Sequence, residues 1–386
     1  MFFRLARVRV AQISCGRLIA RLLARSWRSS FPAPELSESQ LARIAPLLLD
    51  SGGGALAWRR INQSELAHTT AGLELQQAFR QHLLLSGYFE MKTEEVIRAF
   101  RGASLEPNLI KGWSIARAYP LTGLRPYGDI DLCVRPNDYE RAIRLIKSLT
   151  DTPLGIDLHC GFGMLLDRDT DRIFERSPTV KLGKTSIRVL SEEDQLHLLC
   201  VHLLRHGAAR PLWLCDVAVA METRSDYFDW DWCLGTKRYR TNWIACVIKL
   251  VNEILGADDK NLPESVANTK LPGWFIPTVL RQWGIPFANH PSRQPALRTY
   301  LNRPLWWWKA LKDRWPNPIQ GVVSHDAPFS NPLPLPYQVR SYVRRAARYS
   351  ASLLHSSLPS DLPAYTCLEG KDSGSTNQEH RAGNQK

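Results

Sequence analysis

The chain has 386 residues, of which 44% are hydrophobic and 23% are charged. A length of this kind predicts about two compact domains, and the composition is that of a globular protein rather than a disordered or collagen-like chain. The best candidate for a membrane-spanning helix, residues 244–255, is interrupted by Lys249, Asn252 and Glu253. The sequence therefore argues against a transmembrane protein.

The net charge of +13 is concentrated at the two ends of the sequence. Residues 1–34 contain seven arginines and no acid, and residues 293–349 contain ten lysines and arginines against two acids. The middle of the chain is close to neutral, so the basic average does not by itself indicate nucleic-acid binding. We expect no nucleic-acid partner, because the middle lacks a basic groove lined with aromatic residues.

The eight cysteines lie far apart and show neither a C-x-x-C pair nor the spacing of a zinc finger. Most of them fall in apolar stretches and are expected to be small buried hydrophobic residues. This usage predicts a reducing compartment, which we take to be the cytoplasm.

The predicted N-terminal extension, residues 1–34, is open to several interpretations. Its first 30 residues lack the apolar core and cleavage site of a secretory signal. A basic amphipathic helix here could lie on an anionic membrane at the inner face, and an arginine-rich start without acids is also typical of an organelle transit peptide. A frayed extension, or a start codon placed too far upstream, explains the same residues.

The next predicted segments are a helical cap over residues 35–92 and an α+β core over residues 93–190. In the cap, a helix is expected over 38–49, then a flexible glycine run at 52–54, then a helix over 65–88 with apolar residues every three or four positions. The core alternates short strands with helices. Its predicted strands are 108–111, 129–134, 155–160 and 186–190, and its predicted helices are 93–100, 112–119 and 136–149.

Residues 191–290 are predicted to form a helical domain. Ser191 followed by three acids is typical of a helix N-terminus, and helices are expected over 195–206, 211–222 and 243–255. Residues 291–370 form a basic region rich in tryptophan and proline, with a cluster at Trp306–Trp308. Residues 371–386 have no apolar anchor and are expected to be disordered.

The residues most suited to chemistry are acids on two of the predicted strands. Side chains alternate along a strand, so Asp129 and Asp131 share one face, about 7 Å apart, while Ile130 and Leu132 enter the core. Two carboxylates so placed repel each other unless a cation, a basic side chain or water compensates them. A divalent cation such as Mg²⁺ fits best, because it binds carboxylates together with substrate phosphates.

The strand over 155–160 places Asp157 and His159 on one face as well. If this strand neighbours the first, Asp157 completes the three-carboxylate cluster that two-metal phosphoryl transfer requires. His159 is expected to pack or to form hydrogen bonds rather than to bind metal.

Upstream of the acids lies a segment suited to phosphate binding. Gly112 allows a close approach of the backbone, and the helix that begins there offers free N–H groups. Ser114 adds a hydroxyl group, and Lys111 and Arg125 add positive charge.

These segments resemble the nucleotidyltransferase superfamily that includes DNA polymerase β, and they are most similar to the bacterial family of uncharacterised nucleotidyltransferases. That family has K-G-x-(small), then R-x-x-G-D-I-D-L, then D-L-H, which this sequence matches at Lys111–Ser114, Arg125–Leu132 and Asp157–His159. Its H-G and W-L-x-D elements are matched at His206-Gly207 and at Trp213–Asp216. The resemblance covers about half of the chain, residues 95–290.

The resemblance implies an α+β fold with a small mixed sheet, flanked by N-terminal and C-terminal helical segments. It implies transfer of an NMP from an NTP such as ATP to an unidentified acceptor, with release of pyrophosphate. Two Mg²⁺ ions would be bound by Asp129, Asp131 and Asp157, and Asp157 would also act as general base. The nucleotide would be bound by Lys111, Gly112, Ser114 and Arg125.

Other interpretations stay open at this point. The chain could be a non-catalytic interaction protein of the same fold that uses its basic termini at a membrane surface or on an acidic partner. His202 and His206 lie four residues apart, but no glutamate follows His202 as zinc-protease chemistry requires, so a structural role is expected. Asp216 is expected to pair with a base such as Arg210.

Overall fold

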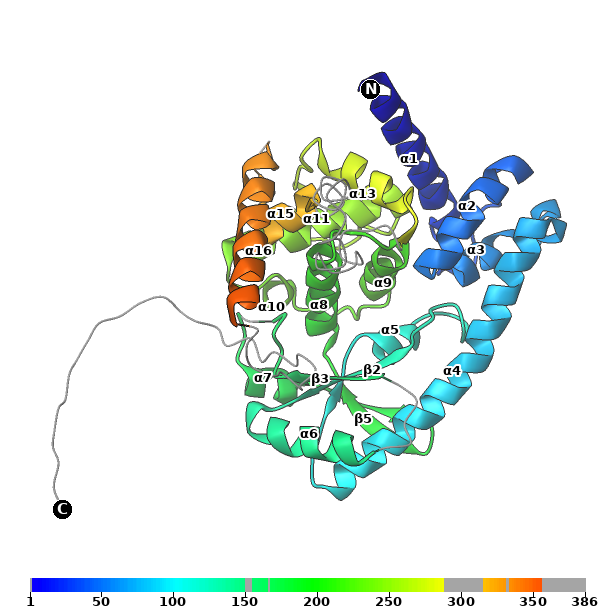
Figure 1. The fold of residues 1–386 in the computed structure, drawn as a ribbon. Coiled ribbons are helices and arrows are strands. Elements are labelled where there is room, and N and C mark those ends of the chain that lie inside the picture. The colour runs from blue at the N-terminus through cyan, green and yellow to red at the C-terminus, as the bar shows by residue number, and fades with distance from the viewer. Residues whose placement is uncertain (1, 150–154, 166, 288–314, 331–332, 356–386) are drawn as a thin grey trace, which may run out of the picture.

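The structure is a computed structural model that describes residues 2–149, 155–165, 167–287, 315–330 and 333–355 (Figure 1). The predicted tryptophan cluster Trp306–Trp308 and the predicted disordered tail 371–386 lie outside the described residues.

A five-stranded mixed sheet forms the lower part of the molecule in Figure 1, with strand order β3-β2-β1-β5-β4. Strands β2 and β3 are parallel, as are β1 and β5, whereas β1–β2 and β4–β5 are antiparallel. The small mixed sheet and the α+β class predicted from the sequence are confirmed. The strands are β1 (Asn108–Leu109), β2 (Asp129–Val134), β3 (Gly155–Cys160), β4 (Thr179–Leu182) and β5 (Thr185–Val189).

One face of this sheet is covered by α4 (Thr70–Gly102) and α6 (Tyr139–Ser148). Ile130 and Leu132 of β2 lie in the same hydrophobic cluster as Phe100 of α4, and all three are buried. Because side chains alternate along a strand, this packing turns Asp129 and Asp131 to the opposite face of β2. The acids of β2 therefore alternate with buried core residues, as the sequence predicts.

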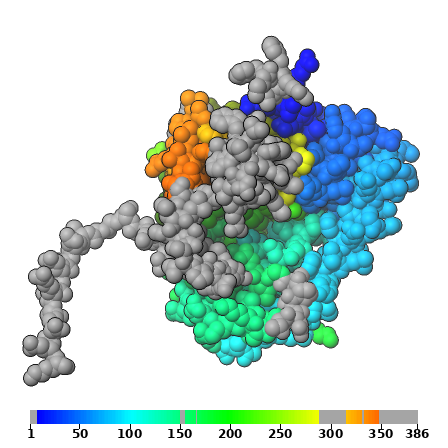
Figure 2. Space-filling model, in the orientation of Figure 1, coloured from blue at the N-terminus to red at the C-terminus, as the bar shows by residue number. Residues whose placement is uncertain are grey.

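Helix α4 is one continuous helix of 33 residues, whereas the sequence analysis predicted two helices, over 65–88 and 93–100. No proline or turn residue separates the two predicted segments, so the helical hydrogen bonds continue through residues 89–92. The boundary predicted between residues 92 and 93 falls inside this helix. Figure 2 shows α4 at the surface along one edge of the molecule, where Leu84 is 78% exposed.

The remaining helices form a layer above the sheet and share one hydrophobic cluster (Figure 1). Residues from both predicted helical segments, 35–92 and 191–290, lie in this cluster. The elements of this layer are α1 (Phe2–Leu23), α2 (Glu38–Ser51), α3 (Gly54–Ile61), α8 (Glu192–Arg205), α9 (Pro211–Glu222), α10 (Trp230–Leu234), α11 (Arg238–Leu255), α12 (Glu264–Ala267), α13 (Phe275–Trp283), α15 (Pro318–Val323) and α16 (Leu335–His355). Shorter elements include η1 (Glu65–His68), α5 (Gly112–Ala116), η2 (Pro136–Asp138) and α7 (Thr170–Arg176).

Helix α1 is integrated into this layer through its second half. Ile19, Leu22 and Leu23 are fully buried in the shared cluster, so these side chains face protein. Within the described residues, no helix combines the length and the apolar composition that crossing a membrane would require.

Candidate active site

The two strands that carry the acids lie next to each other. β2 and β3 pair in parallel with Asp131 opposite Asp157 and Cys133 opposite His159. The strand adjacency on which the sequence analysis depended is therefore present. Asp129 begins β2 opposite Gly155, two residues before Asp131 on the same face, and is exposed.

Asp131, Asp157 and His159 together form a group that could hold a metal ion, with one ligand atom from each residue lying within 4.8 Å of the others. The Nε2 atom of His159 lies 3.3 Å from Oδ1 of Asp131 and 3.2 Å from Oδ2 of Asp157. Two carboxylates and an imidazole are a donor set that fits a divalent cation. His159 was expected to pack or to form hydrogen bonds rather than to bind metal. The hydrogen bond with Asp131 is present, and the same geometry also makes His159 a candidate ligand.

Lys111 brings a positive charge to this group. Its Nζ atom lies 2.7 Å from Oδ1 of Asp131, and both side chains are largely buried. The backbone of Lys111 has φ 51°, a conformation that residues with a side chain rarely adopt, and Gly112 follows with φ 26°. Such conformations are found where the surrounding structure holds a residue in place for function.

The pKa values of Asp129, Asp157 and His159 are shifted in different directions. Desolvation and the neighbouring charge of Asp131 raise the pKa of Asp129. The hydrogen bond from His159 lowers the pKa of Asp157. Burial opposes the charged form of His159, yet hydrogen bonds to Asp131 and Asp157 raise its pKa above the ordinary value. The site thus favours positive charge beside Asp131 and Asp157, as a cation-binding site requires.

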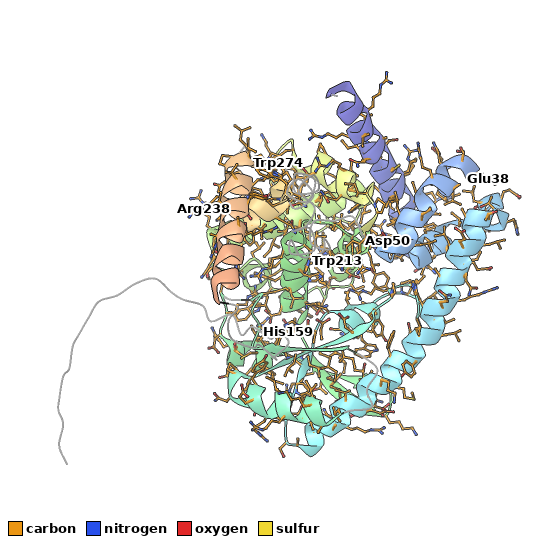
Figure 3. The ribbon with its side chains drawn as sticks, in the orientation of Figure 1. Glu38, Asp50, His159, Trp213, Arg238 and Trp274 are labelled. Carbon is orange, nitrogen blue, oxygen red and sulfur yellow. The ribbon has the colours of Figure 1, made fainter. Side chains whose placement is uncertain are left out.

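A cavity of about 480 Å³ opens between this face of the sheet and the helices α8 and α9. Its volume lies in the range of small-molecule sites. Figure 3 shows His159 on the sheet and Trp213 on the helical layer above it. The sheet side of the cavity is lined by Lys111, Gly112, Asp129, Asp131 and Asp157, and the helical side by Leu199, His202, His206, Arg210, Leu212, Trp213 and Asp216.

Arg125 lines the cavity, and its guanidinium group forms an ion pair with Asp216. Its Nη2 atom lies 2.9 Å from Oδ2 of the fully buried Asp216, and Tyr119 donates to Oδ1 of the same carboxylate at 2.9 Å. Desolvation opposes the guanidinium charge, but Asp216 raises the pKa of Arg125. Asp216 was expected to pair with a base such as Arg210; the base that contacts it is Arg125, 91 positions away in the sequence.

Ser114 does not line the cavity. It is 5% exposed, and its Oγ atom lies 3.4 Å from Oε1 of Gln195 in α8. The structure therefore brings six of the seven candidate residues to the cavity and leaves Ser114 outside its lining.

His202, His206, Arg210 and Trp213 line the cavity but were not among the expected site residues. The signal that points to them is the match of His206-Gly207 and Trp213–Asp216 to family elements in the helical part. Their spacing alone could not place them, since it does not show which face of α8 and α9 meets the sheet.

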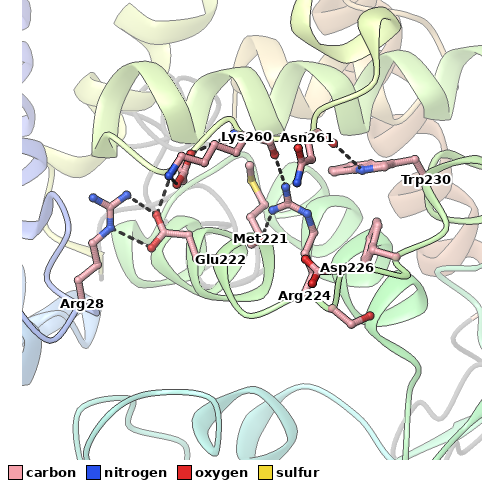
Figure 4. Close-up of a pocket in the computed structure, with 11 residues that line it drawn as sticks. Arg28, Met221, Glu222, Arg224, Asp226, Trp230, Lys260 and Asn261 are labelled. Atoms are coloured by element: carbon pink, nitrogen blue, oxygen red, sulfur yellow. Dashed lines mark hydrogen bonds and ion pairs between the residues drawn. The ribbon is translucent and has the colours of Figure 1, made fainter.

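A second cavity, of about 400 Å³, lies at the end of α9 (Figure 4). Its acid Glu222 accepts hydrogen bonds from Arg28, from the indole of Trp27 at 2.8 Å and from the backbone N–H of Asp258 at 2.9 Å. These contacts tie the segment after α1 to α9. We assign the second cavity to the packing of the helical layer.

The fold and the site define a class of protein. The small mixed sheet in a mostly helical chain is consistent with a nucleotidyltransferase-like fold, and two acids on its adjacent parallel strands line a cavity. The model of the family described as "Uncharacterised nucleotidyltransferase" matches residues 42–153 and 149–246, more than half of the chain, and the chain belongs to this family. Searches of curated proteins and of solved structures found no match.

Proposed function

We propose that this protein is a divalent-metal-dependent nucleotidyltransferase that transfers an NMP from an NTP to an acceptor and releases pyrophosphate. The observation that carries the proposal is the in-register placement of Asp131 and Asp157 on the wall of a cavity. His159 lies against both carboxylates. The acceptor, whether a sugar, a peptide, a protein or another small molecule, is not specified by these residues.

Asp129, Asp131 and Asp157 would hold the metal, which we propose to be Mg²⁺, together with His159. When bound, the metal neutralises the triphosphate and lowers the pKa of the acceptor hydroxyl. Asp157 is about half exposed, so its carboxylate would be accessible to accept the proton of an entering acceptor. Positioning and charge neutralisation then account for most of the catalysis.

Lys111 and Gly112 would contact the triphosphate. The ammonium group of Lys111 lies beside Asp131, where the phosphates would meet the metal, and Gly112 lines the cavity without a side chain. Arg125, which was expected to bind nucleotide, would do so from its fixed position on Asp216. For Ser114 we propose a positioning role, in which its contact with Gln195 fixes the short helix α5 against α8.

Calorimetric titration of the intact protein with ATP, GTP, CTP and UTP, with and without Mg²⁺, tests this function. We expect binding that requires the metal and that is lost in an Asp129→Asn/Asp131→Asn variant. The matched control is Asp226→Asn, which removes an exposed acid from the second cavity and should leave binding unchanged. A folded wild-type protein that binds no NTP at millimolar concentration, with or without metal, would contradict the proposal.

We also propose that the protein works in a reducing compartment, the cytoplasm. The seven cysteines in the described part of the chain are free, and five of them are buried. Buried free thiols support this placement, because an oxidising compartment favours disulfides.

A further inference from the structure

The helical wall of the cavity carries a cluster of rings opposite the acids. His202 of α8 and His206, which directly follows α8, have ring centroids separated by 4.6 Å. The indole of Trp213, from α9, lies 4.8 Å from the ring of His202 and 5.1 Å from that of His206. All three side chains line the cavity. We call them the ring cluster.

Both histidines of the ring cluster are neutral at physiological pH. Burial, with the nearby charge of Lys111, lowers the pKa of His206 to about 4, and burial with the neighbouring His206 lowers that of His202 well below its ordinary value. A neutral imidazole has one donor and one acceptor nitrogen. It therefore suits the edge of a heterocycle better than it suits a phosphate group. The Nδ1 atom of His202 is buried and has no hydrogen-bond partner among the residues that the structure describes.

The indole of Trp213 is held in place before any ligand binds. The guanidinium group of Arg210 lies 5.5 Å from its ring centroid and 4.6 Å from that of Phe287. Phe287 in turn meets the indole edge-on, with centroids 6.4 Å apart. Cation–π and edge-to-face contacts of this kind fix the ring orientation. A ligand that meets Trp213 thus meets a preorganised aromatic surface.

We propose that the ring cluster of His202, His206 and Trp213 binds the heteroaromatic base of the NTP whose phosphates lie at the acids. This inference rests on the proposed function, which it extends from the phosphate end of the substrate to its base. The sheet side of the cavity has acids that suit metal-bound phosphates. Its helical side has an indole and two neutral imidazoles, next to the guanidinium group of Arg210. A nucleotide has a phosphate end and a base end, and one small molecule of its class fits a cavity of about 480 Å³.

The experiment is calorimetric titration of the intact protein, in the presence of Mg²⁺, with the four NTPs and with inorganic tripolyphosphate. Trp213→Leu should weaken the binding of NTPs about ten- to a hundredfold, the usual effect of losing a stacking ring. It should leave the affinity for tripolyphosphate unchanged, because that probe has no base. Asp131→Asn should weaken the binding of both.

Two further variants sharpen the test. His206→Phe keeps a ring beside His202 and Trp213 but removes the hydrogen-bonding nitrogens, so we expect the affinities for the four NTPs to become more alike. Trp315→Leu removes a partly exposed tryptophan that does not line the cavity and should change neither affinity. Thermal unfolding of each variant shows whether it is folded. If Trp213→Leu does not fold, the affinities of His206→Phe decide the test.

The outcomes separate this inference from the proposed function. NTP binding that is lost in Asp131→Asn but intact in Trp213→Leu and His206→Phe leaves the proposed function standing and overturns the base-binding role. Equal weakening of NTP and tripolyphosphate binding by Trp213→Leu overturns it too, because the indole would then support the cavity as a whole. A wild-type protein that binds tripolyphosphate and NTPs equally well contradicts the inference alone, whereas one that binds neither contradicts both.

Discussion

At the scale of single residues, the site is built from charges that are buried in pairs. Lys111 lies against Asp131, and Arg125 lies against Asp216, with at most 11% of any of these side chains exposed. A buried ion pair adds little net stability, but removing one partner leaves the other charge uncompensated. Each pair can therefore be tested by deleting one member.

Replacing Lys111 by methionine should destabilise the metal-free protein by about 3 kcal/mol, because the buried Asp131 loses its lysine and retains the hydrogen bond with His159. Adding Mg²⁺ should restore part of this loss, since the cation then supplies the missing charge. Thermal unfolding with and without the metal measures both effects. Lys92→Met, which breaks an ion pair with the exposed Glu95, serves as control and should cost less than about 1 kcal/mol. A Lys111→Met protein that is equally stable with and without metal would contradict a metal site at Asp131.

The pair formed by Arg125 and Asp216 predicts a graded response. Asp216→Asn should lower the free energy of unfolding by about 3–5 kcal/mol, because the buried guanidinium group loses its counter-charge. Tyr119→Phe removes one hydrogen bond to the same carboxylate and should cost only about 1 kcal/mol. Urea unfolding measures both variants, with Asp138→Asn in the exposed pair with Arg141 as control. Equal losses for Asp216→Asn and Tyr119→Phe would show that the charge of Asp216 is not what matters.

At the scale of elements, the sequence predicted the strands of the site better than the helices around them. The bounds of β2 and β3 match the predicted ranges 129–134 and 155–160, because alternating apolar residues leave one phase for the core. Strand β4 was not predicted, since a four-residue edge strand carries little pattern. The sequence predicted two helices where the structure has the single helix α4. The buried face of α4 contacts the helical layer at its start and the sheet at its end, so the apolar periodicity changes along its length.

The packing of α1 on α13 was also beyond prediction, although glycines make it possible. A Cβ atom on Gly16 would lie 1.9 Å from the backbone oxygen of Leu280, and one on Gly284 would lie 2.0 Å from that of Gln12. The two helices thus approach each other backbone to backbone at two points. A glycine in a sequence does not reveal which distant backbone it will meet.

Gly16→Ala should therefore destabilise the protein by about 1–3 kcal/mol, because the backbone of α13 cannot yield as a flexible side chain would. Gly87→Ala is the matched control. Gly87 lies inside α4 with no atom within 4 Å of the added Cβ, so the substitution should stabilise the helix by about 0.5–1 kcal/mol. Urea unfolding of the two variants should give shifts of opposite sign, and a stabilised Gly16→Ala protein would contradict the close crossing.

At the scale of the whole molecule, function depends on how the sheet faces the helical layer. The sequence predicted the acids and their strands, but the ring cluster came from α8 and α9, whose orientation depends on contacts between distant segments. One such contact is the buried Arg168, which follows β3. Its guanidinium group contacts Asp194 of α8, Nδ1 of His197 at 3.0 Å, and the backbone oxygen of Cys233 at 2.9 Å. No local pattern in the sequence predicts these contacts of Arg168.

The last prediction concerns this connection between the layers. Arg168→Met should leave Asp194 as an unpaired buried charge and lower the free energy of unfolding by about 3–5 kcal/mol. Because this contact holds the segment after β3 against α8, the helix that carries His202, we also expect weaker NTP binding with an unchanged affinity for tripolyphosphate. Arg172→Met is the control. Arg168 and Arg172 both lie over the ring of Trp232, at 5.3 and 5.8 Å, but Arg172 is exposed. Urea unfolding and calorimetry on the same samples measure both effects. An Arg168→Met protein that loses stability yet binds NTPs as wild type does would show that the cavity keeps its shape without this contact.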